Sequence, residues 1–373
     1  MNNNENEEYL TTQIITYIGN KRSLLDFIGN AVLEVKNRLK KDKLDIVDLF
    51  SGSGIVSRYF KQYSNTLIAN DLEDYSYTLN KCYLTNKSEI DLKELEKYYS
   101  NILDNISKNG IHGGMISTLY APKDINNIKL GERCFFTPQN AKYIDTVRTL
   151  INEVPYEYRH FFIAPLLTEA SVKNNTSGVF KGFYKNSKTG IGQFGGTKED
   201  ALSRIKKDIE LPFPIFSNYE CNIKIYKDDA NKLIKDLELV DLIYMDPPYN
   251  QHPYGSNYFM LNVINDYEEP KEISEVSGIP KDWNRSNYNK SRQALKSFKE
   301  LCQNAKARYL LISFNSEGFI TKEQMINMLS EIGKVKVMEK TYNTYRGSRN
   351  LNNRPIHVKE YLYLVEVEKY KHE

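Results

Sequence analysis

Short runs of apolar residues alternate along this chain with longer stretches in which apolar residues recur every three or four positions. The short runs predict buried strands, and the longer period predicts amphipathic helices. Strands are expected at residues 44–50, 66–70, 221–226, 242–246, 309–314, 335–341 and 361–367. Helices are expected at about residues 24–39, 55–62, 138–151, 156–172, 231–237, 259–264 and 322–332. This alternation, which ends in a pair of strands, predicts an open α/β sheet that is mostly parallel, with an antiparallel strand near the C-terminus.

The segment 81–215 departs from this alternation, because it is mostly helical and contains a polar loop at 174–196 with interspersed lysines and aromatic residues. Such a loop does not build a core, but it can follow a phosphate backbone and stack on bases; a flexible surface loop is the alternative. We therefore predict one α/β domain formed by 1–80 and 216–373, interrupted by an inserted helical and loop region at 81–215. The polar residues 1–10 are expected to be disordered.

The strand expected at 242–246 runs into Asp246, Pro247, Pro248 and Tyr249. The prolines stop the strand, because neither can donate to a β-ladder or continue a helix. What remains is a stiff turn with a carboxylate, a proline carbonyl and an aromatic ring. This turn can hold an exocyclic amine on a flat heterocycle, with the amine donating to Asp246 and the Pro247 carbonyl while the Tyr249 ring stacks. A simple strand-ending turn is the alternative.

A glycine loop at 51–54 follows the strand expected at 44–50, and the next strand ends in Asp71. In a β-loop-α-β unit of this kind, loop amides approach a nucleoside and the acid binds its ribose hydroxyls. The unit differs from the dinucleotide fingerprint at Ser57, where the third Gly or Ala would stand. NAD and S-adenosylmethionine both fit this pattern, and a glycine turn without a ligand is the alternative. Lys21, which follows a Gly-Asn turn, can bind a carboxylate or can simply be solvated.

Composition and charge argue against several classes of protein. No apolar run approaches the roughly 18 residues of a membrane-spanning helix, and the acidic N-terminus lacks the features of a signal peptide, so we expect a cytoplasmic protein without a membrane partner. The four cysteines show no paired spacing and the five histidines do not cluster, so neither a disulfide framework nor a metal site is expected. The net charge of +3 is too small to indicate a nucleic-acid partner by itself.

Four motifs, in this order, resemble those of the Dam-like alpha group of amino-methylating DNA adenine methyltransferases. They are Tyr17-Ile18-Gly19-Asn20-Lys21, Asp48-Leu49-Phe50-Ser51-Gly52-Ser53-Gly54, Asn70-Asp71 and Asp246-Pro247-Pro248-Tyr249. Residues 174–178, 246–262 and 345–354 are most similar to the subgroup that accompanies type IIS restriction systems such as the FokI system. The resemblance implies a Rossmann-like sheet that uses S-adenosyl-L-methionine, with the inserted region as the DNA target-recognition region.

The resemblance also implies roles for individual residues. The target amine would be held by Asp246, Pro247, Pro248 and Tyr249. The methyl donor would be contacted by Tyr17, Gly19, Lys21, Asp48, Phe50, Gly52, Gly54, Asp71, Asp229 and Asp246. In this assignment Lys21 lies near the methionine carboxylate, Asp71 binds the ribose and Asp229 binds the adenine. Candidate contacts to DNA, with solvated surface cations as the alternative, are Lys181, Lys185, Arg346, Arg349 and Arg354.

The implied function is site-specific transfer of a methyl group from S-adenosyl-L-methionine to the 6-amino group of a flipped-out adenine in double-stranded DNA, as the protective half of a restriction-modification system. No metal is needed. A cognate restriction endonuclease and a second methyltransferase for the other strand are candidate partners. Alternatives are an amino-methyltransferase acting on cytosine, RNA or protein, and a catalytically silent DNA-binding subunit of a modification complex. A nicotinamide-dependent oxidoreductase is disfavoured, because no proton-transfer residue accompanies the glycine loop.

Overall fold

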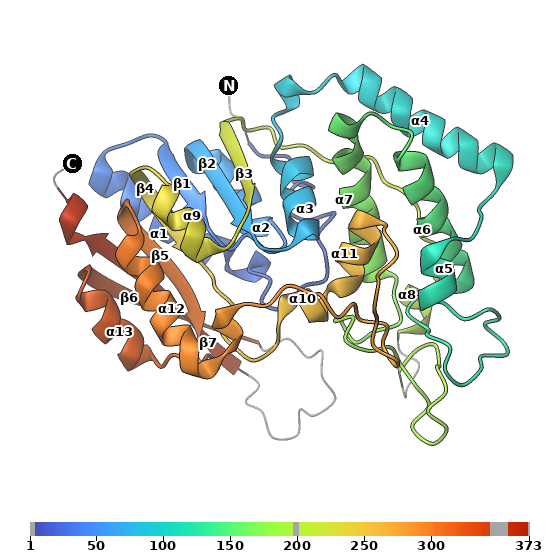
Figure 1. Cartoon of the computed structure of the whole chain (residues 1–373). Coiled ribbons are helices and arrows are strands. Elements are labelled where there is room, and N and C mark those ends of the chain that lie inside the picture. The colour runs from blue at the N-terminus through green and yellow to red at the C-terminus, as the bar shows by residue number, and fades with distance from the viewer. Residues whose placement is uncertain (1–3, 197–200, 344–356, 372–373) are drawn as a thin grey trace.

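The computed structural model of this chain describes residues 4–196, 201–343 and 357–371. Its strands are β1 (Leu44–Asp48), β2 (Ser64–Asp71), β3 (Asn222–Lys227), β4 (Val240–Met245), β5 (Ala307–Asn315), β6 (Gly333–Asn343) and β7 (His357–Val367). They form one seven-stranded sheet in the order β3-β2-β1-β4-β5-β7-β6 (Figure 1). The strands β1 to β5 pair in parallel, whereas β7 is antiparallel to β5 and β6. The predicted α/β sheet, mostly parallel with an antiparallel strand near the C-terminus, is confirmed.

Alternate residues of the central strands face opposite sides of the sheet, as the two-residue period of a strand requires. Ile46 and Leu242 belong to the core that includes α1 (Leu25–Leu39) and α2 (Ile55–Phe60). Their chain neighbours Val47 and Ile243 belong to the core on the other face. That face is covered by α9 (Ala230–Asp236), α12 (Ser291–Asn304) and α13 (Lys322–Ser330). Covering on both faces explains why every residue of β4 is buried.

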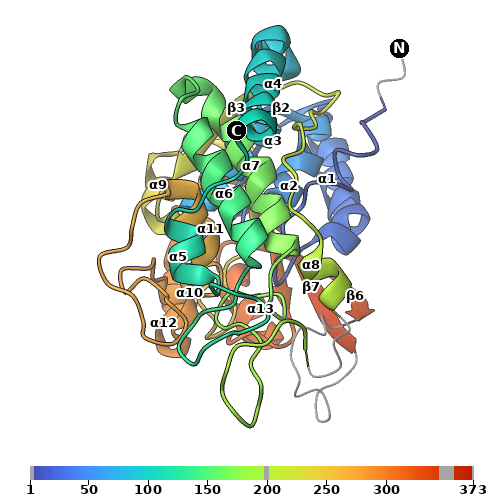
Figure 2. The ribbon, with the colours of Figure 1, turned by 90° about the vertical axis from the view of Figure 1, so that its right-hand side faces the viewer.

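A second group of helices packs beside the sheet around its own core of aliphatic and aromatic residues (Figures 1 and 2). The helices of this side of the molecule are α3 (Asp74–Leu84), α4 (Leu92–Asn109), α5 (Met115–Tyr120), α6 (Pro138–Ile151), α7 (Tyr156–Val172), α8 (Leu202–Lys206), α10 (Tyr254–Asn257) and α11 (Phe259–Asp266). The sequence boundaries predicted for α6 and α7 are confirmed. α11 packs against α3 and α7, so this core includes residues outside the predicted insertion. The domain boundaries at 80 and 216 stay a prediction.

Single 3₁₀ turns complete the secondary structure described. They lie at Arg22–Leu24, Lys61–Tyr63, Lys87–Glu89, Asn287–Asn289 and Glu368–Tyr370. None of the helices in the described ranges is both long enough and apolar enough to cross a membrane.

The N-terminal residues are ordered where the structure describes them, so the expected disorder of residues 1–10 is wrong for 4–10. Tyr9 is fully buried, and its hydroxyl donates a hydrogen bond to the carbonyl of Tyr83. The guanidinium of Arg58 lies 4.6 Å from the centroid of the Tyr9 ring. A single aromatic residue in a polar stretch has no periodicity that would reveal its burial. Its partners come from distant segments of the chain.

Candidate active site

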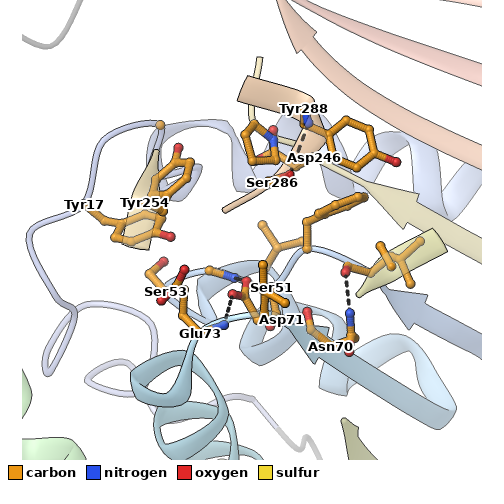
Figure 3. A pocket seen from close by; sticks show the side chains of 18 of the residues that line it. Tyr17, Ser51, Ser53, Asn70, Asp71, Glu73, Asp246, Tyr254, Ser286 and Tyr288 are labelled. Carbon is orange, nitrogen blue, oxygen red and sulfur yellow. Dashed lines mark hydrogen bonds between the residues drawn. The ribbon is translucent and has the colours of Figure 1, made fainter. Parts of the chain in front are cut away.

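A pocket opens at the carboxyl ends of β1, β2 and β4, which meet at one edge of the sheet because the three strands are parallel (Figure 3). The predicted site residues that line it are Tyr17, Gly19, Lys21, Phe50, Gly52, Asp71, Asp229, Asp246 and Pro248. The other predicted residues of these motifs, which are not among the lining residues, are Asp48, Gly54, Pro247 and Tyr249. Four motifs that are far apart in sequence therefore converge on one cavity.

The glycine loop after β1 has a backbone that only glycine adopts readily. Gly52 and Gly54 have positive φ angles of 52° and 77°. A Cβ atom on Gly54 would stand 2.8 Å from Oδ1 of Asn80, and one on Gly52 would stand 3.0 Å from the Tyr17 ring. The amide of Gly52 donates to Oδ2 of Asp71 at 2.7 Å. The loop thus fixes the Asp71 carboxylate at the pocket.

Asp48 supports this loop from inside the core. It is fully buried, and the hydroxyl of Ser57 donates to its Oδ2 at 2.5 Å. Burial raises the pKa of Asp48 to about 7, although the Ser57 hydrogen bond opposes the shift. Ser57 stands where the dinucleotide fingerprint has a third Gly or Ala. Its hydroxyl binds the buried carboxylate of Asp48, which gives this side chain a structural role.

A second carboxylate that the sequence analysis missed lies beside Asp71. Glu73 is 4% exposed, lines the pocket and accepts a hydrogen bond from Nδ2 of Asn262 at 2.7 Å. Burial and the nearby charge of Asp71 raise the pKa of Glu73 to about 7, against the opposing effect of Asn262. Burial also raises the pKa of Asp71, against the hydrogen bonds from the amides of Glu73 and Gly52. The end of β2 thus presents two acidic side chains to the pocket.

Asp229 lines the pocket at the start of α9. Its Oδ1 caps this helix by accepting from the amides of Asn231 at 2.9 Å and Lys232 at 3.2 Å. The neighbouring carbonyl of Asp228 accepts from Nδ2 of Asn70 at 3.1 Å, which ties the start of α9 to the end of β2.

Asp246 shares one ammonium group with a second, deeper carboxylate. The Nζ atom of Lys21 lies 3.2 Å from Oδ1 of Asp246 and 3.1 Å from Oε1 of Glu360. Burial raises the pKa of Asp246 to about 7; Lys21 opposes the shift and Glu360 adds to it. Burial alone would lower the pKa of Lys21, but the two carboxylates raise it well above its usual value. Lys21 is therefore charged and forms ion pairs with Asp246 and Glu360. Its predicted position beside the methionine carboxylate of the methyl donor stays a prediction.

The turn after β4 is held by β5 and by the segment that follows β5. The carbonyl of Tyr249 accepts from the amide of Phe319 at 2.9 Å, and its ring meets that of Phe314 edge to face with centroids 6.0 Å apart. Burial raises the pKa of Tyr249 to about 12, so its hydroxyl stays protonated near neutral pH. The Tyr249 ring is 9% exposed and faces the Gly19 turn, where a Cβ atom would stand 3.6 Å from its hydroxyl.

Two tyrosines that the sequence analysis left without a role hold Tyr17 in place. The rings of Tyr254 and Tyr258 stack on Tyr17 with centroids 4.9 Å and 4.6 Å away. The Tyr254 hydroxyl donates to the carbonyl of Ile18 at 3.1 Å, and the amide of Ile18 donates to the Tyr258 hydroxyl at 2.6 Å. The segment after the Asp-Pro-Pro-Tyr motif therefore positions the first motif of the chain. Figure 3 shows Tyr17 and Tyr254 together at one side of the pocket.

The pocket is bordered by residues 284–289, which we call the strap. Asn284, Ser286, Tyr288 and Asn289 of the strap line the pocket. Nδ2 of Asn284 donates to the Leu72 carbonyl at 3.2 Å and to Oε2 of Glu73 at 3.3 Å. The strap lies in a polar stretch that shows no periodicity, so its sequence carried no signal of this position.

The candidate DNA contacts lie apart from the pocket or outside the described residues. Lys181 is exposed and Lys185 is half-buried, with its Nζ 4.8 Å from the centroid of the Phe183 ring. Both belong to the loop that follows α7 (Figure 1). Arg346, Arg349 and Arg354 lie outside the described residues. Within the described ranges, no group of three or more His, Cys, Asp and Glu residues is arranged to hold a metal ion.

Comparisons with known proteins agree on one family. The family model described as D12 class N6 adenine-specific DNA methyltransferase matches residues 17–328. The chain is 31% identical over 365 residues to the type II methyltransferase M.NlaIII of Neisseria lactamica, covering 94% of this chain and 99% of that protein. It is also 31% identical to the type II methyltransferase M.CviAII of Paramecium bursaria Chlorella virus 1, covering 95% and 99% of the two chains.

A longer relative comes from the restriction systems that the sequence motifs resembled. The chain is 29% identical to the type II methyltransferase M.FokI of Planomicrobium okeanokoites, covering 94% of this chain but 52% of that protein. The matched part of M.FokI is thus about half of its length.

Proposed function

This chain belongs to the D12 class N6 adenine-specific DNA methyltransferases, and we propose that it transfers a methyl group from S-adenosyl-L-methionine to the 6-amino group of a flipped-out adenine in double-stranded DNA. The observation that carries this proposal is the position of Asp246. Its carboxylate lines a pocket that is also lined by Gly52 and Asp71. An amine acceptor and a nucleoside-binding unit therefore face the same space.

The pocket fits a nucleoside that carries a methyl group. Asp71 and Glu73 would bind the ribose hydroxyls, because both carboxylates line the cavity at the end of β2. Phe50 and Tyr288, whose rings meet edge to face with centroids 5.4 Å apart, supply an apolar wall for the base, with Asp229 at the start of α9. Bound S-adenosyl-L-methionine would supply an electrophilic methyl group on a sulfonium.

Asp246 would hold the amine that receives this methyl group. Because Lys21 binds Oδ1 of Asp246, Oδ2 can accept a hydrogen bond from the amine. The Pro247 carbonyl would be the second acceptor, and the Tyr249 ring would stack on the adenine. An amine conjugated with its ring is a poor nucleophile, and two acceptors favour the pyramidal nitrogen and stabilise the positive charge that develops on it. The adenine must leave the DNA stack to reach this position.

The methylated nitrogen must lose one of its protons. Burial raises the pKa of Asp246 to about 7. A carboxylate with this pKa can accept the proton at Oδ2 near neutral pH, and solvent can then remove it. Holding the amine, stabilising charge and accepting the proton would thus be functions of one side chain.

The direct test is transfer of labelled methyl from S-adenosyl-L-methionine to adenine-containing duplex DNA, with methylated positions mapped by sequencing. We expect Asp246→Ala to lower kcat by at least about 100-fold, since it removes a group that stabilises transition-state charge, and to weaken cofactor binding far less. The matched control is Asp236→Ala, an exposed carboxylate at the end of α9, which should leave the rate unchanged. Normal turnover by Asp246→Ala would contradict the assignment.

We further propose that the enzyme modifies one short DNA sequence as the protective half of a restriction-modification system. Its relatives M.NlaIII and M.FokI are type II methyltransferases, which supports this assignment. A cognate endonuclease would cut the same sequence. An asymmetric site would need a second methyltransferase for the other strand. Sequencing of methylated genomic DNA from a host that expresses the chain would identify the site, and methylation without sequence preference would contradict this part of the proposal.

A further inference from the structure

Glu360 is a fully buried carboxylate directly behind the proposed catalytic group. Its Oε1 lies 3.1 Å from Nζ of Lys21, and that Nζ lies 3.2 Å from Oδ1 of Asp246. The side-chain exposures are 0% for Glu360, 4% for Lys21 and 17% for Asp246, so exposure to solvent rises from Glu360 towards Asp246. A charge at such depth is costly unless it has a function or close partners.

The sheet topology brings Glu360 to this position. β7 lies antiparallel beside β5, and Glu360 pairs with Asn315 at the carboxyl end of β5. The carboxyl end of β5 is adjacent to that of β4, where Asp246 follows. The hydroxyl of Ser313 donates to Oε1 of Glu360 at 2.5 Å and fixes the carboxylate from the β5 side.

Several ionisable groups face this cluster, and they come from different elements. They are Lys21 before α1, Asp48 on β1, Tyr244 on β4, Tyr249 after β4, Tyr254 on α10 and Glu360 on β7. The tyrosine hydroxyls have raised pKa values and are neutral near pH 7. Within the described part of the chain, Asp246 and Glu360 share the ammonium group of Lys21.

We propose that Glu360 is a positioning residue of the methyl-transfer reaction. It anchors the Lys21 ammonium on Oδ1 of Asp246, so that Oδ2 points to the target amine, and its negative charge offsets the positive charge of Lys21. Without this offset, Lys21 would withdraw electron density from Asp246 and weaken it as an acceptor. The inference rests on the proposed function, because it assigns Glu360 a role through Asp246.

The test is the pH dependence of kcat for Glu360→Gln, which keeps the size of the side chain and removes its charge. We expect kcat to fall roughly tenfold, less than for a direct transition-state contact. The KM values for cofactor and DNA should stay unchanged. The acid limb of the profile should move to lower pH, because Glu360 contributes to the raised pKa of Asp246. Glu360→Asp keeps the charge, so it should retain the acid limb of the wild type.

The matched control is Glu366→Gln on the same strand, which removes a charge at an ion pair with Arg38 that lies partly in solvent. Its kcat and pH profile should equal those of the wild type. A Glu360→Gln enzyme with wild-type kcat and an unshifted acid limb would overturn the inference.

A third variant keeps the inference testable if Glu360→Gln does not fold. Ser313→Ala removes the hydroxyl that holds Glu360 but no charge, so kcat should fall while the acid limb stays in place. An unchanged kcat in Ser313→Ala would then overturn the inference. If the wild type transfers no methyl group to DNA, the proposed function is wrong. If the wild type is active and the variants have the same kcat and pH profile as the wild type, only the role of Glu360 is wrong.

Discussion

Asp246 combines two environments that act in opposite directions on one carboxyl group. Burial favours the neutral acid, whereas the Lys21 ammonium 3.2 Å away favours the carboxylate. Glu360 also forms an ion pair with Lys21, and its negative charge raises the pKa of Asp246 further. The result is a group whose pKa is about 7 and whose protonation changes near neutral pH.

The rate of methyl transfer should therefore fall as the pH drops through about 7. The sign follows from the role of the group: a raised pKa means that Asp246 is already protonated below this pH, and a protonated Oδ2 cannot accept from the amine. The measurement is single-turnover methyl transfer across about pH 6 to 9 at saturating cofactor and DNA. A rate that stays constant down to pH 6 would show that the carboxylate form of Asp246 is not required.

The glycine loop, Asp71 and the Asp-Pro-Pro-Tyr turn could be predicted from sequence, because each is a local pattern whose chemistry depends on residues next to one another. Glu73, Tyr254 and Glu360 could not be predicted in this way. Their importance comes from partners that only the fold brings close, such as Asn262 for Glu73 and Lys21 for Glu360.

At the scale of elements, the strap at 284–289 is attached to the rest of the pocket wall through side chains of its own residues. Asn284 holds it to the end of β2 through the Leu72 carbonyl and the Glu73 carboxylate. The hydroxyl of Tyr288 donates to Oδ1 of Asn231 at 2.7 Å, which holds the strap to α9. The strap therefore borders the pocket through side-chain hydrogen bonds.

Asn284→Ala should weaken cofactor binding while leaving kcat at saturating cofactor nearly unchanged. A lost hydrogen bond of about 1 kcal/mol corresponds to a roughly fivefold higher dissociation constant. Calorimetric titration with S-adenosyl-L-methionine measures this change. The control is Asn287→Ala, an exposed residue of the same strap, which should bind like the wild type. Equal affinity for all three proteins would mean that the strap does not contribute to cofactor binding.

For α6, a capping signal and the apolar period predict the same start of the helix. α6 begins at Pro138 after Thr137, whose hydroxyl accepts from the amide of Asn140 at 3.1 Å, and its predicted boundaries are those of the structure. β6 is longer than its predicted range of 335–341, because strand pairing with β7 extends it to Gly333 at one end. The strap and residues 4–10 were not predicted, since neither carries a periodic apolar pattern.

The whole molecule places a sheet with its pocket beside a helical group that has its own core. The loop after α7 extends from the helical group (Figure 1). This loop is held to the segment that contains Ser277, because the Ser277 hydroxyl donates a hydrogen bond to the carbonyl of Lys181 at 2.9 Å. The exposed Lys181 side chain is thus attached to a segment that is held to the rest of the molecule.

Lys181→Glu should weaken DNA binding and reduce its dependence on salt. Losing one phosphate contact lowers the slope of log K against log salt by about 0.9. Binding to duplex DNA at several salt concentrations measures both effects. Lys224→Glu, at an exposed position of the edge strand β3, is the control with the same charge change. If the two variants bind alike, Lys181 is not a DNA contact.

The place of β7 in the sheet has a consequence for a chain that is still being synthesised. β7 is the last strand in chain order, yet it lies between β5 and β6 and supplies Glu360. A nascent chain that has exposed β1 to β6 already contains the glycine loop, Lys21 and Asp246. The edge strand β6 still has no neighbour, and the ammonium still has one carboxylate instead of two. The residues that line the pocket therefore leave the ribosome before Glu360 does, and the row of charges around Lys21 is complete only when β7 has joined the sheet.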